Sequence, residues 1–345
     1  MSSETNSIDQ MPKKSPLSFQ VDLKKFEKAT DEEKRQQDVM SESVSFFKDG
    51  MRKLMKNPLA VGSIIVLIVI IAMILIVPHV VPYKYSQIIT VNGSRDKAAG
   101  NMAPFTYSEK ELAYMAEGGE VFPHIMGTDS MGRDYFIRVI YGTRVSLTVG
   151  LFAAVIVLLI GVVYGSISGY FGGKVDMVMM RIVDILMSVP SFLIIITLNI
   201  YMNAGIRTLV VTIGLFSWMG VARIVRAEVL SLRERDFILA SEGLGARKSW
   251  VITRHFARNV FSPVLVASTN SIASAILTES SLSYLGFGIS IPNPSWGGML
   301  EGAQTYILTH PSLAVYPGVC ILLTVLCFNV LGNGFRRRFS PNSGR

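Results

Sequence analysis

Cysteine and histidine are scarce in this chain of 345 residues, which has two Cys and four His. Cys320 and Cys327 lie seven residues apart in one apolar run, so they share a face of a predicted helix and cannot bridge to each other there. The histidines have no spacing typical of metal ligands; they are His79, His124, His255 and His310. The sequence therefore predicts packing cysteines and no metal site.

Charged residues are also scarce, at 17% of the chain, whereas 50% of the residues are hydrophobic and the mean hydropathy is +0.42. The apolar residues come in long blocks rather than being spread through the chain. This composition excludes an ordinary soluble domain and predicts a membrane protein with several spans.

The chain lacks the phosphate-binding pattern G-x-x-x-x-G-K-[ST] and any recognisable pair of nucleophile and base. The nearest approach is GLGARKS at 243–249, where Arg247 replaces the glycine before the lysine and no strand leads into the segment. These absences argue against a nucleotide-hydrolysing subunit and against an enzyme within the membrane.

Charges are missing from the middle of the apolar blocks as well. Asp176, Arg181 and Asp184 fall in the first turns of one block, Glu279 falls near the outer end of another, and Arg207 is a lone outlier. Ion-coupled carriers need charged side chains near the bilayer centre, although each costs on the order of 2.5–3.5 kcal/mol there. The sequence therefore disfavours an ion-coupled carrier.

Six apolar stretches are predicted to cross the membrane, because a helix needs about 20 apolar residues to span about 30 Å of hydrocarbon. They are 59–78, 145–171, 177–202, 208–222, 260–282 and 313–335. Pro190 predicts a kink in the third, either a gate hinge or a static bend. The fourth has only 15 uncharged residues, so Arg207 and Arg223 are expected to reach opposite interfaces.

The loops predict the orientation, because Lys and Arg are enriched on the cytoplasmic side. The loop 223–259 carries eight basic residues, whereas 286–312 carries none. Both termini are therefore predicted to be cytoplasmic. The 58 residues before the first span are charged and its apolar run is long, so we expect that span to remain as an anchor rather than a cleaved signal peptide.

These patterns divide the chain into six predicted parts. They are a disordered cytoplasmic segment at 1–43, an interfacial amphipathic helix or a simple basic flank at 44–58, a first span at 59–82, an external segment at 83–143, a core of five spans at 144–335 that includes the cytoplasmic loop 223–259, and a cytoplasmic tail at 336–345.

The loop DFILASEGLGARKSWVITRHFARN at 236–259 combines a short helix, a glycine pair and a second basic helix. Two glycines cost about 1 kcal/mol each in a helix, which is tolerable where a partner must approach the backbone closely. Phe237, Leu239 and Leu244 offer apolar anchors, and the basic residues that offer charge complementarity are Arg235, Arg247 and Lys248. The alternative is a plain solvent-exposed connector.

A ridge of Gly161, Gly165 and Gly169 in the second span allows close crossing of helices. The partner of this ridge is either another helix of the same chain or a second membrane subunit.

Three passages carry a family resemblance: GTDSMGRDYFIRVIYGTRVSLTVG at 127–150, ILASEGLGARKSWVITRHFARN at 238–259, and LTESSLSYLGFG with PNPSWGGML within 277–300. Over about 46–341 the chain resembles the C-type (OppC/DppC-like) permease subunits of bacterial dipeptide and oligopeptide ABC importers. It departs from them at Arg258, where the family often has proline, and in an insertion at 91–121 without an assigned role.

The resemblance implies an all-α, six-helix permease of the type I ABC importer (MetI-like) fold in the bacterial plasma membrane. Its implied partners are a homologous second permease, two cytoplasmic ATPases that bind ATP and Mg²⁺, an extracellular solute-binding lipoprotein, a peptide substrate and membrane lipid, with no nucleic acid. It implies no cofactor in this chain and no enzymatic activity. The rivals are a permease for nickel or another small solute and a non-conducting membrane scaffold.

The resemblance also assigns candidate site residues. The ATPase-coupling residues are Leu239, Ala240, Ser241, Glu242, Gly243, Gly245 and Arg247. The candidates for external contact with the binding protein are Asp129, Arg133, Asp134 and Trp296, of which the first three form, in the alternative, a local ion-pair cluster. Glu279 either lines the translocation path or is an interfacial carboxylate bonded to nearby backbone.

Overall fold

The structure is a computed structural model that describes residues 46–91, 93–203, 205–245 and 257–338. The segment predicted to be disordered, 1–43, lies outside these residues. So do the second helix predicted in the cytoplasmic loop, at 246–256, and the tail from 339 onward.

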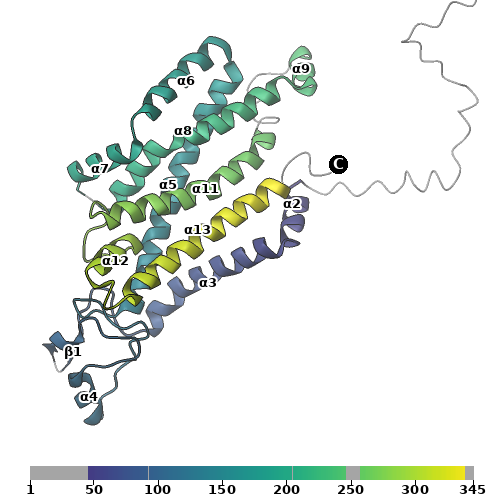
Figure 1. Ribbon diagram of the computed structural model, residues 1–345. Helices are drawn as coiled ribbons and strands as arrows, with labels where there is room; N and C mark the ends of the chain where they lie inside the picture. Colours follow the sequence, from purple (N-terminus) through teal and green to yellow (C-terminus); the bar gives the residue numbers. More distant parts are fainter. Residues whose placement is uncertain (1–45, 92, 204, 246–256, 339–345) are drawn as a thin grey trace, which may run out of the picture. The chain divides into compact units, whose positions relative to one another are not determined.

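The described chain is mostly helical, as predicted (Figure 1). The long helices are α3 (Pro58–Val80), α5 (Tyr135–Phe171), α6 (Gly173–Ser188), α7 (Ser191–Tyr201), α8 (Ile206–Arg233), α11 (Ala257–Tyr284) and α13 (Ser312–Arg338). The short elements are α2 (Phe46–Met55), β1 (Thr90–Val91), β2 (Ser94–Arg95), η2 (Lys97–Ala99), α4 (Glu109–Ala116), α9 (Asp236–Gly243), α12 (Trp296–Ala303) and η4 (Gln304–Tyr306). β1 and β2 pair antiparallel.

The long helices pack side by side around α5 and α11. α5 runs along α8, α11 contacts both α5 and α13, and α3 packs on α13 (Figure 1). The largest buried cluster joins α5 and α8 through side chains such as Val157, Val221 and Val225. α12 packs against α11 and α13 at the end of the bundle where the segment between α3 and α5 also lies.

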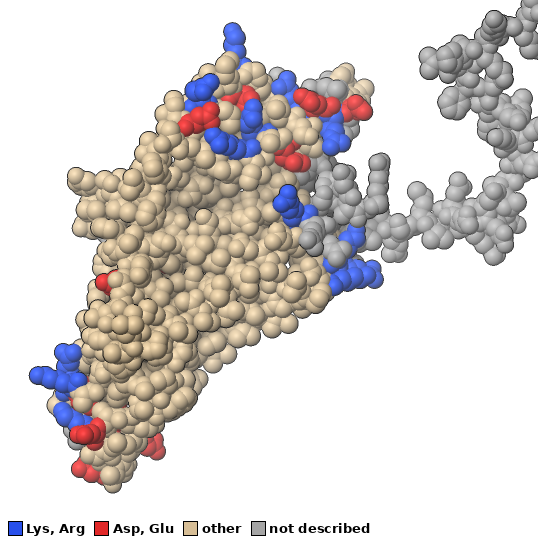
Figure 2. Space-filling model, in the orientation of Figure 1, with Lys and Arg blue, Asp and Glu red and all other residues tan. Residues whose placement is uncertain are grey.

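Five helices are long and apolar enough to cross a membrane, and the bent pair α6 and α7 makes a sixth. Each predicted span falls on one of these helices or on that pair. Large apolar side chains are exposed along their outer faces, for example Ile68 on α3 and Leu322 on α13. Figure 2 shows charged side chains gathered at the two ends of the visible face, with an almost uncharged band between them. Such a band matches the hydrocarbon layer of a bilayer.

The second span begins ten residues earlier than predicted, at Tyr135 rather than at 145, so the external segment is shorter than 83–143. Asp134 is its N-cap, where the side chain accepts a hydrogen bond from the amide of Ile137 at 3.0 Å. The predicted span starts after Arg144, but α5 includes both Arg144, which is exposed, and Arg138, whose charge is paired with Asp129.

The fourth span is also longer than the predicted 208–222. α8 has 28 residues, or roughly 42 Å at 1.5 Å per residue, and it continues to Arg233. The arginines beyond Ala222 do not end the helix, because Arg223 pairs with Asp184 and Arg226 with Asp176. The first part of the predicted loop 223–259 is therefore the end of a long helix.

The third span is broken as predicted. α6 ends at Ser188 and α7 begins at Ser191, with Pro190 between them, and their axes differ by 71°. Most of the large apolar side chains of α6 remain exposed in this chain, including Met177, Val178 and Ile185.

The predicted amphipathic helix before the first span is present as α2. Its Leu54 is buried and packs with Ala60 of α3 and Leu331 of α13. Part of its apolar face is therefore covered by protein.

Candidate functional site

The glycine ridge of α5 faces α8 of the same chain. Gly161 lies against Val221, Gly165 against Ala222 and Gly169 against Arg226 and Val229. A Cβ atom added at Gly165 would lie 2.4 Å from the carbonyl oxygen of Ala222, so only glycine permits this crossing. Of the two predicted partners, the structure supports the helix within the chain.

Two ion pairs hold α6 against α8 near the point where the glycine ridge of α5 meets α8. Both oxygens of Asp176 accept hydrogen bonds from the guanidinium of Arg226, and Ser168 of α5 also donates to Asp176 at 2.6 Å. Arg223 binds Asp184, in a pair that is about half exposed. The buried carboxylate of Asp176 thus joins α5, α6 and α8 at the end of the bundle that leads into α9.

α9 carries part of the predicted coupling segment, and the side chain of Ile238 attaches it to the bundle. Ile238 is buried in the cluster that contains Val229 and Leu232 of α8. Beyond it Leu244 is 89% exposed, and Gly245 adopts a φ of +81°, the left-handed conformation that often ends a helix. The end of α9 therefore leaves the backbone at Gly245 and the side chain of Leu244 exposed.

The other predicted coupling residues are only partly described. Ala240 and Gly243 are exposed, and Ser241 is half-buried. The structure places Leu239 and Glu242 within α9. Arg247 lies outside the described residues. Ile238, which ties the segment to the bundle, was not among the predicted site residues, because only the folded structure shows which side of α9 meets α8.

At the opposite end of the bundle, Asp129 organises the residues that precede α5. Its carboxylate accepts hydrogen bonds from the amides of Met131 and Arg133 at 2.9 and 3.0 Å, and from the Nε atom of Arg133 at 2.7 Å. Arg138 reaches the same carboxylate from one turn into α5, at 3.3 Å, and donates to the carbonyl of Tyr85 at 2.9 Å.

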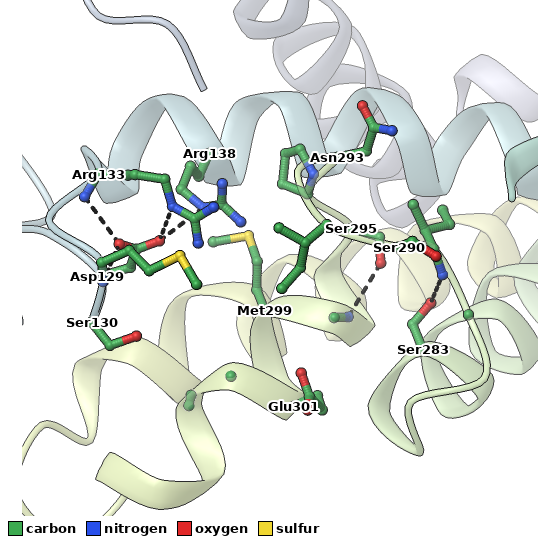
Figure 3. A pocket seen from close by; sticks show the side chains of 18 of the residues that line it. Asp129, Ser130, Arg133, Arg138, Ser283, Ser290, Asn293, Ser295, Met299 and Glu301 are labelled. Carbon is green, nitrogen blue, oxygen red and sulfur yellow. Dashed lines mark hydrogen bonds and ion pairs between the residues drawn. The ribbon is translucent and has the colours of Figure 1, made fainter. Parts of the chain in front are cut away.

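These groups line a cavity of about 310 Å³ between the start of α5, the loop after α11, and α12 (Figure 3). Asp129, Arg133 and Arg138 lie together on one side of it, while Ser283 and Ser295 lie toward the other. Arg138 was not predicted as a site residue, because its place in the cavity follows from the earlier start of α5.

The predicted external-contact residues are buried, so Trp296 and Asp134 present no surface to an external protein, while Asp129 and Arg133 reach only the cavity. Trp296 is 0% exposed, and Asp134 is held as the N-cap of α5. Asp129 and Arg133 are buried in their ion pair. The structure therefore supports the alternative of a local cluster that braces the start of α5, and Trp296 packs inside the protein rather than at an interface.

Glu279 of α11 is fully buried among serine hydroxyl groups. Ser146 of α5 and Ser283 of α11 each donate to its carboxylate at 2.8 Å. Ser146 in turn accepts from the amide of Trp296 at 3.3 Å, at the start of α12. The carboxylate thus connects α5, α11 and α12 through side chains rather than through the backbone contacts predicted in one alternative.

His124 forms a second buried cluster in the segment between α3 and α5. Its Nδ1 atom is 2.8 Å from Asp134, and its Nε2 atom is 3.0 Å from Glu111 of α4. Burial alone would lower the pKa of His124, but the hydrogen bonds and charges of the two carboxylates outweigh burial and raise this pKa to about 9. Glu111 belongs to the insertion at 91–121, for which the sequence predicts no role. Through His124 it is linked to Asp134, the N-cap of α5.

The cysteines pack as predicted and are not paired with each other. Cys327 is buried and Cys320 is half-buried, and both are free thiols. Among the residues that the structure describes, no group of three metal-ligating side chains comes together.

Two family models match the chain. One, described as "Binding-protein-dependent transport system inner membrane component", matches residues 161–344. The other, described as "N-terminal TM domain of oligopeptide transport permease C", matches residues 45–109. Together they cover the first span and the predicted coupling segment.

Relatives of known function resemble the chain over most of its length. The oligopeptide transport system permease protein OppC of Bacillus subtilis (strain 168) is 36% identical over 303 residues, which are 88% of this chain and 92% of that protein. The dipeptide transport system permease protein DppC of the same strain is 36% identical over 304 residues, 88% of each chain. OppC of Escherichia coli (strain K12) is 36% identical over 301 residues, 87% of this chain and 92% of that protein.

A solved structure of the inward-facing MetNI methionine ABC transporter has the same fold. It aligns with a TM-score of 0.51 and 16% sequence identity over 59% of this chain and 97% of that chain. The alignment confirms the predicted MetI-like permease fold.

Proposed function

This chain belongs to the family of inner membrane components of binding-protein-dependent transport systems, and we propose that it is a permease subunit of an ABC importer for oligopeptides or dipeptides. The observation that carries the proposal is the match at 36% identity over most of the chain to permeases named for both substrates. The spans and the uncharged band support a place in the membrane.

The chain is a transport subunit, and we expect the energy for transport to come from other subunits. ATP and Mg²⁺ would be held by two cytoplasmic ATPases, and a homologous permease would complete the conduit. The exposed apolar side chains of α6, such as Met177 and Ile185, offer a surface for that permease or for lipid. An external binding protein would deliver the peptide.

We expect the ATPases to act on the bundle through α9. A displaced α9 would carry α8 with it, because Ile238 is buried against Val229 and Leu232. α8 would in turn carry α5, since their backbones touch at Gly165 and leave no room to slide independently. This series of contacts offers a path by which ATPase closure would change the packing of the spans.

The test is the substitution Gly245→Arg in the importer assembled with its partner subunits. A Cβ atom at Gly245 would meet no atom of the described residues within 4 Å, so a large side chain there would extend into the space assigned to the ATPase, with some backbone strain at its φ of +81°. We expect peptide uptake and ATPase association to be lost while the amount of chain in the membrane is unchanged. Uptake equal to that of the wild type would contradict the coupling role.

Gly245→Asn is the matched control. Asparagine tolerates the left-handed backbone conformation that Gly245 adopts at a φ of +81°, and its side chain is small. We expect this variant to retain most of the uptake. Equal loss in both variants would show that the backbone conformation, and not the space beside it, is what matters.

A further inference from the structure

The cavity beside Asp129 holds more positive than negative buried charge. Two guanidinium groups, from Arg133 and Arg138, share one carboxylate oxygen of Asp129, at 2.7 and 3.3 Å. The side chains of all three residues are about nine-tenths buried or more. The lining thus holds two buried guanidinium groups against one buried carboxylate, while the buried carboxylate of Glu279 lies behind Ser283 and makes no ion pair with either arginine among the residues described.

The arginines also keep free donors. The contacts of Arg133 involve its Nε atom, and those of Arg138 involve Nε and one terminal nitrogen. The remaining terminal nitrogens of the two residues have no partner among the residues described, and both residues line the cavity. A guanidinium group binds a carboxylate through two parallel hydrogen bonds, so these donors suit that ligand.

The rest of the lining leaves room for such a group. The volume of about 310 Å³ falls at the lower end of the ~300–1,000 Å³ typical of small-ligand pockets. Glu301, the other charged residue of the lining, is exposed on α12 and forms no ion pair with either arginine (Figure 3).

We infer that this cavity binds a carboxylate group, which Arg133 and Arg138 receive beside Asp129. The inference adds a ligand to the proposed function. It rests on that function only for the identity of the molecule that carries the carboxylate. That source is either the C-terminus of the transported peptide or an acidic side chain of the external binding protein.

The first experiment measures binding to the purified full-length chain in lipid nanodiscs, without transport. The probes are N-acetyl-trialanine and its C-terminal amide, which differ only in the charge of the C-terminus. We expect the acid to bind at least about tenfold more tightly than the amide, because a charge-assisted hydrogen bond contributes at least that factor. Equal affinity for the two probes, or no binding of the acid, would overturn the inference.

Two variants localise the binding. Arg138→Gln removes one guanidinium and should weaken binding of the acid at least about tenfold. Gly302→Leu leaves the arginines untouched and adds a bulky side chain to a residue of the cavity lining, at a position with open space around it. It should weaken binding of the acid even where Arg138→Gln fails to fold. Unchanged affinity in Arg138→Gln, or in Gly302→Leu where Arg138→Gln does not fold, would place the probe elsewhere and overturn the inference.

The controls are chosen to match each variant. Arg207→Gln removes a positive charge from an exposed arginine at the start of α8, outside the lining of this cavity. Gly302→Ala adds only a methyl group in the open space. Both should bind the acid as the wild type does, and a tenfold loss in Arg207→Gln would mean that general surface charge, not this cavity, attracts the probe.

The second experiment uses the assembled importer to identify the source of the carboxylate. If the source is the peptide, Arg138→Gln should remove the preference for trialanine over its amide in uptake and leave docking of the binding protein unchanged. If it is the binding protein, the docking affinity should fall about tenfold and the uptake ratio stay the same. No change in either measurement would overturn a role in import. A wild-type importer that takes up no peptide would count against the proposed function instead, since probe binding is measured without transport.

Discussion

Individual glycines decide how closely the two central helices of this permease approach each other. The sequence shows the ridge in α5 but not its partner, since any close helix in lipid would suit it. The folded chain places Ala222 and Val225 of α8 against Gly165. The absence of a side chain at that position is therefore a requirement of the bundle itself.

Gly165→Ala should destabilise the chain, even though alanine is the better helix former by about 1 kcal/mol. The added Cβ atom would lie 2.4 Å from the carbonyl oxygen of Ala222, so the backbones of α5 and α8 must separate. We expect a net loss of about 1–3 kcal/mol, as for other overpacked sites, measured as a lower Tm of the purified chain in detergent.

Gly220→Ala is the comparison in the same pair of helices. A Cβ atom at Gly220 meets no other atom within 4 Å, so only the helix propensity changes. Its Tm should be unchanged or higher. A drop in Tm equal to that of Gly165→Ala would mean that packing of the ridge is not the cause.

At the scale of elements, two helices are longer than their apolar residues indicate. α5 and α8 both continue through arginines, and Arg138 of α5 and Arg226 of α8 are each paired with an aspartate from another part of the chain. α8 continues beyond the predicted span to the turn before α9. The bundle and the predicted coupling segment are thus joined by one continuous helix.

The attachment of α4 to the start of α5 should depend on pH. The pKa of His124 is raised from its ordinary value of 6.5 to about 9 in the folded chain, so its protonated form favours folding. This contribution is fully present below pH 6.5 and is lost as the pH rises through about 9.

The pKa of Glu111 is lowered from its ordinary value of 4.5 by the hydrogen bonds from His124 and Ser108, which outweigh its burial. Its contribution is lost as the pH falls below that value.

Hydrogen exchange of the segment 81–134 between pH 6.5 and pH 10 measures this effect. We expect protection, corrected for the intrinsic exchange rate, to fall as the pH passes about 9, and His124→Gln to have low protection with little pH dependence over that range. His79→Gln, at an exposed histidine on α3, should retain the wild-type profile. A pH profile in His124→Gln identical to that of the wild type would rule out this histidine as the titrating group.

For the whole molecule, the distribution of basic residues predicts that α9 faces the cytoplasm and that the loop after α12 faces outward. Two exposed leucines report on the two sides: Leu244 after α9 is 89% exposed, and Leu308 before α13 is 94% exposed. Each can be replaced by cysteine after Cys320 and Cys327 have been changed to alanine, so that a single thiol remains.

In right-side-out spheroplasts, a membrane-impermeant maleimide should label the Leu308→Cys variant directly and the Leu244→Cys variant only after permeabilisation. The cysteine-free parent chain controls for background labelling. The opposite pattern would reverse the predicted orientation and would place α9 out of reach of cytoplasmic ATPases.

The sequence by itself determined the membrane class, the location of the six spans, the break at Pro190 and the permease family. These follow from local properties, because a bilayer forces each span to satisfy its own backbone and to remain apolar. The same reasoning placed span ends at Arg144 and Arg223, whereas α5 begins before the first of these arginines and α8 continues beyond the second.

Only the tertiary structure decided which charges are neutralised and which residues are accessible. Asp129 and Trp296 resembled an external contact surface, yet they are buried, and the cavity beside them depends on Arg138. Partners such as Glu111 and Asp134 meet at His124 from separate stretches of chain. Such contacts arise from helix packing and chain tracing, which no local pattern encodes, and they set the burial that governs charge and binding.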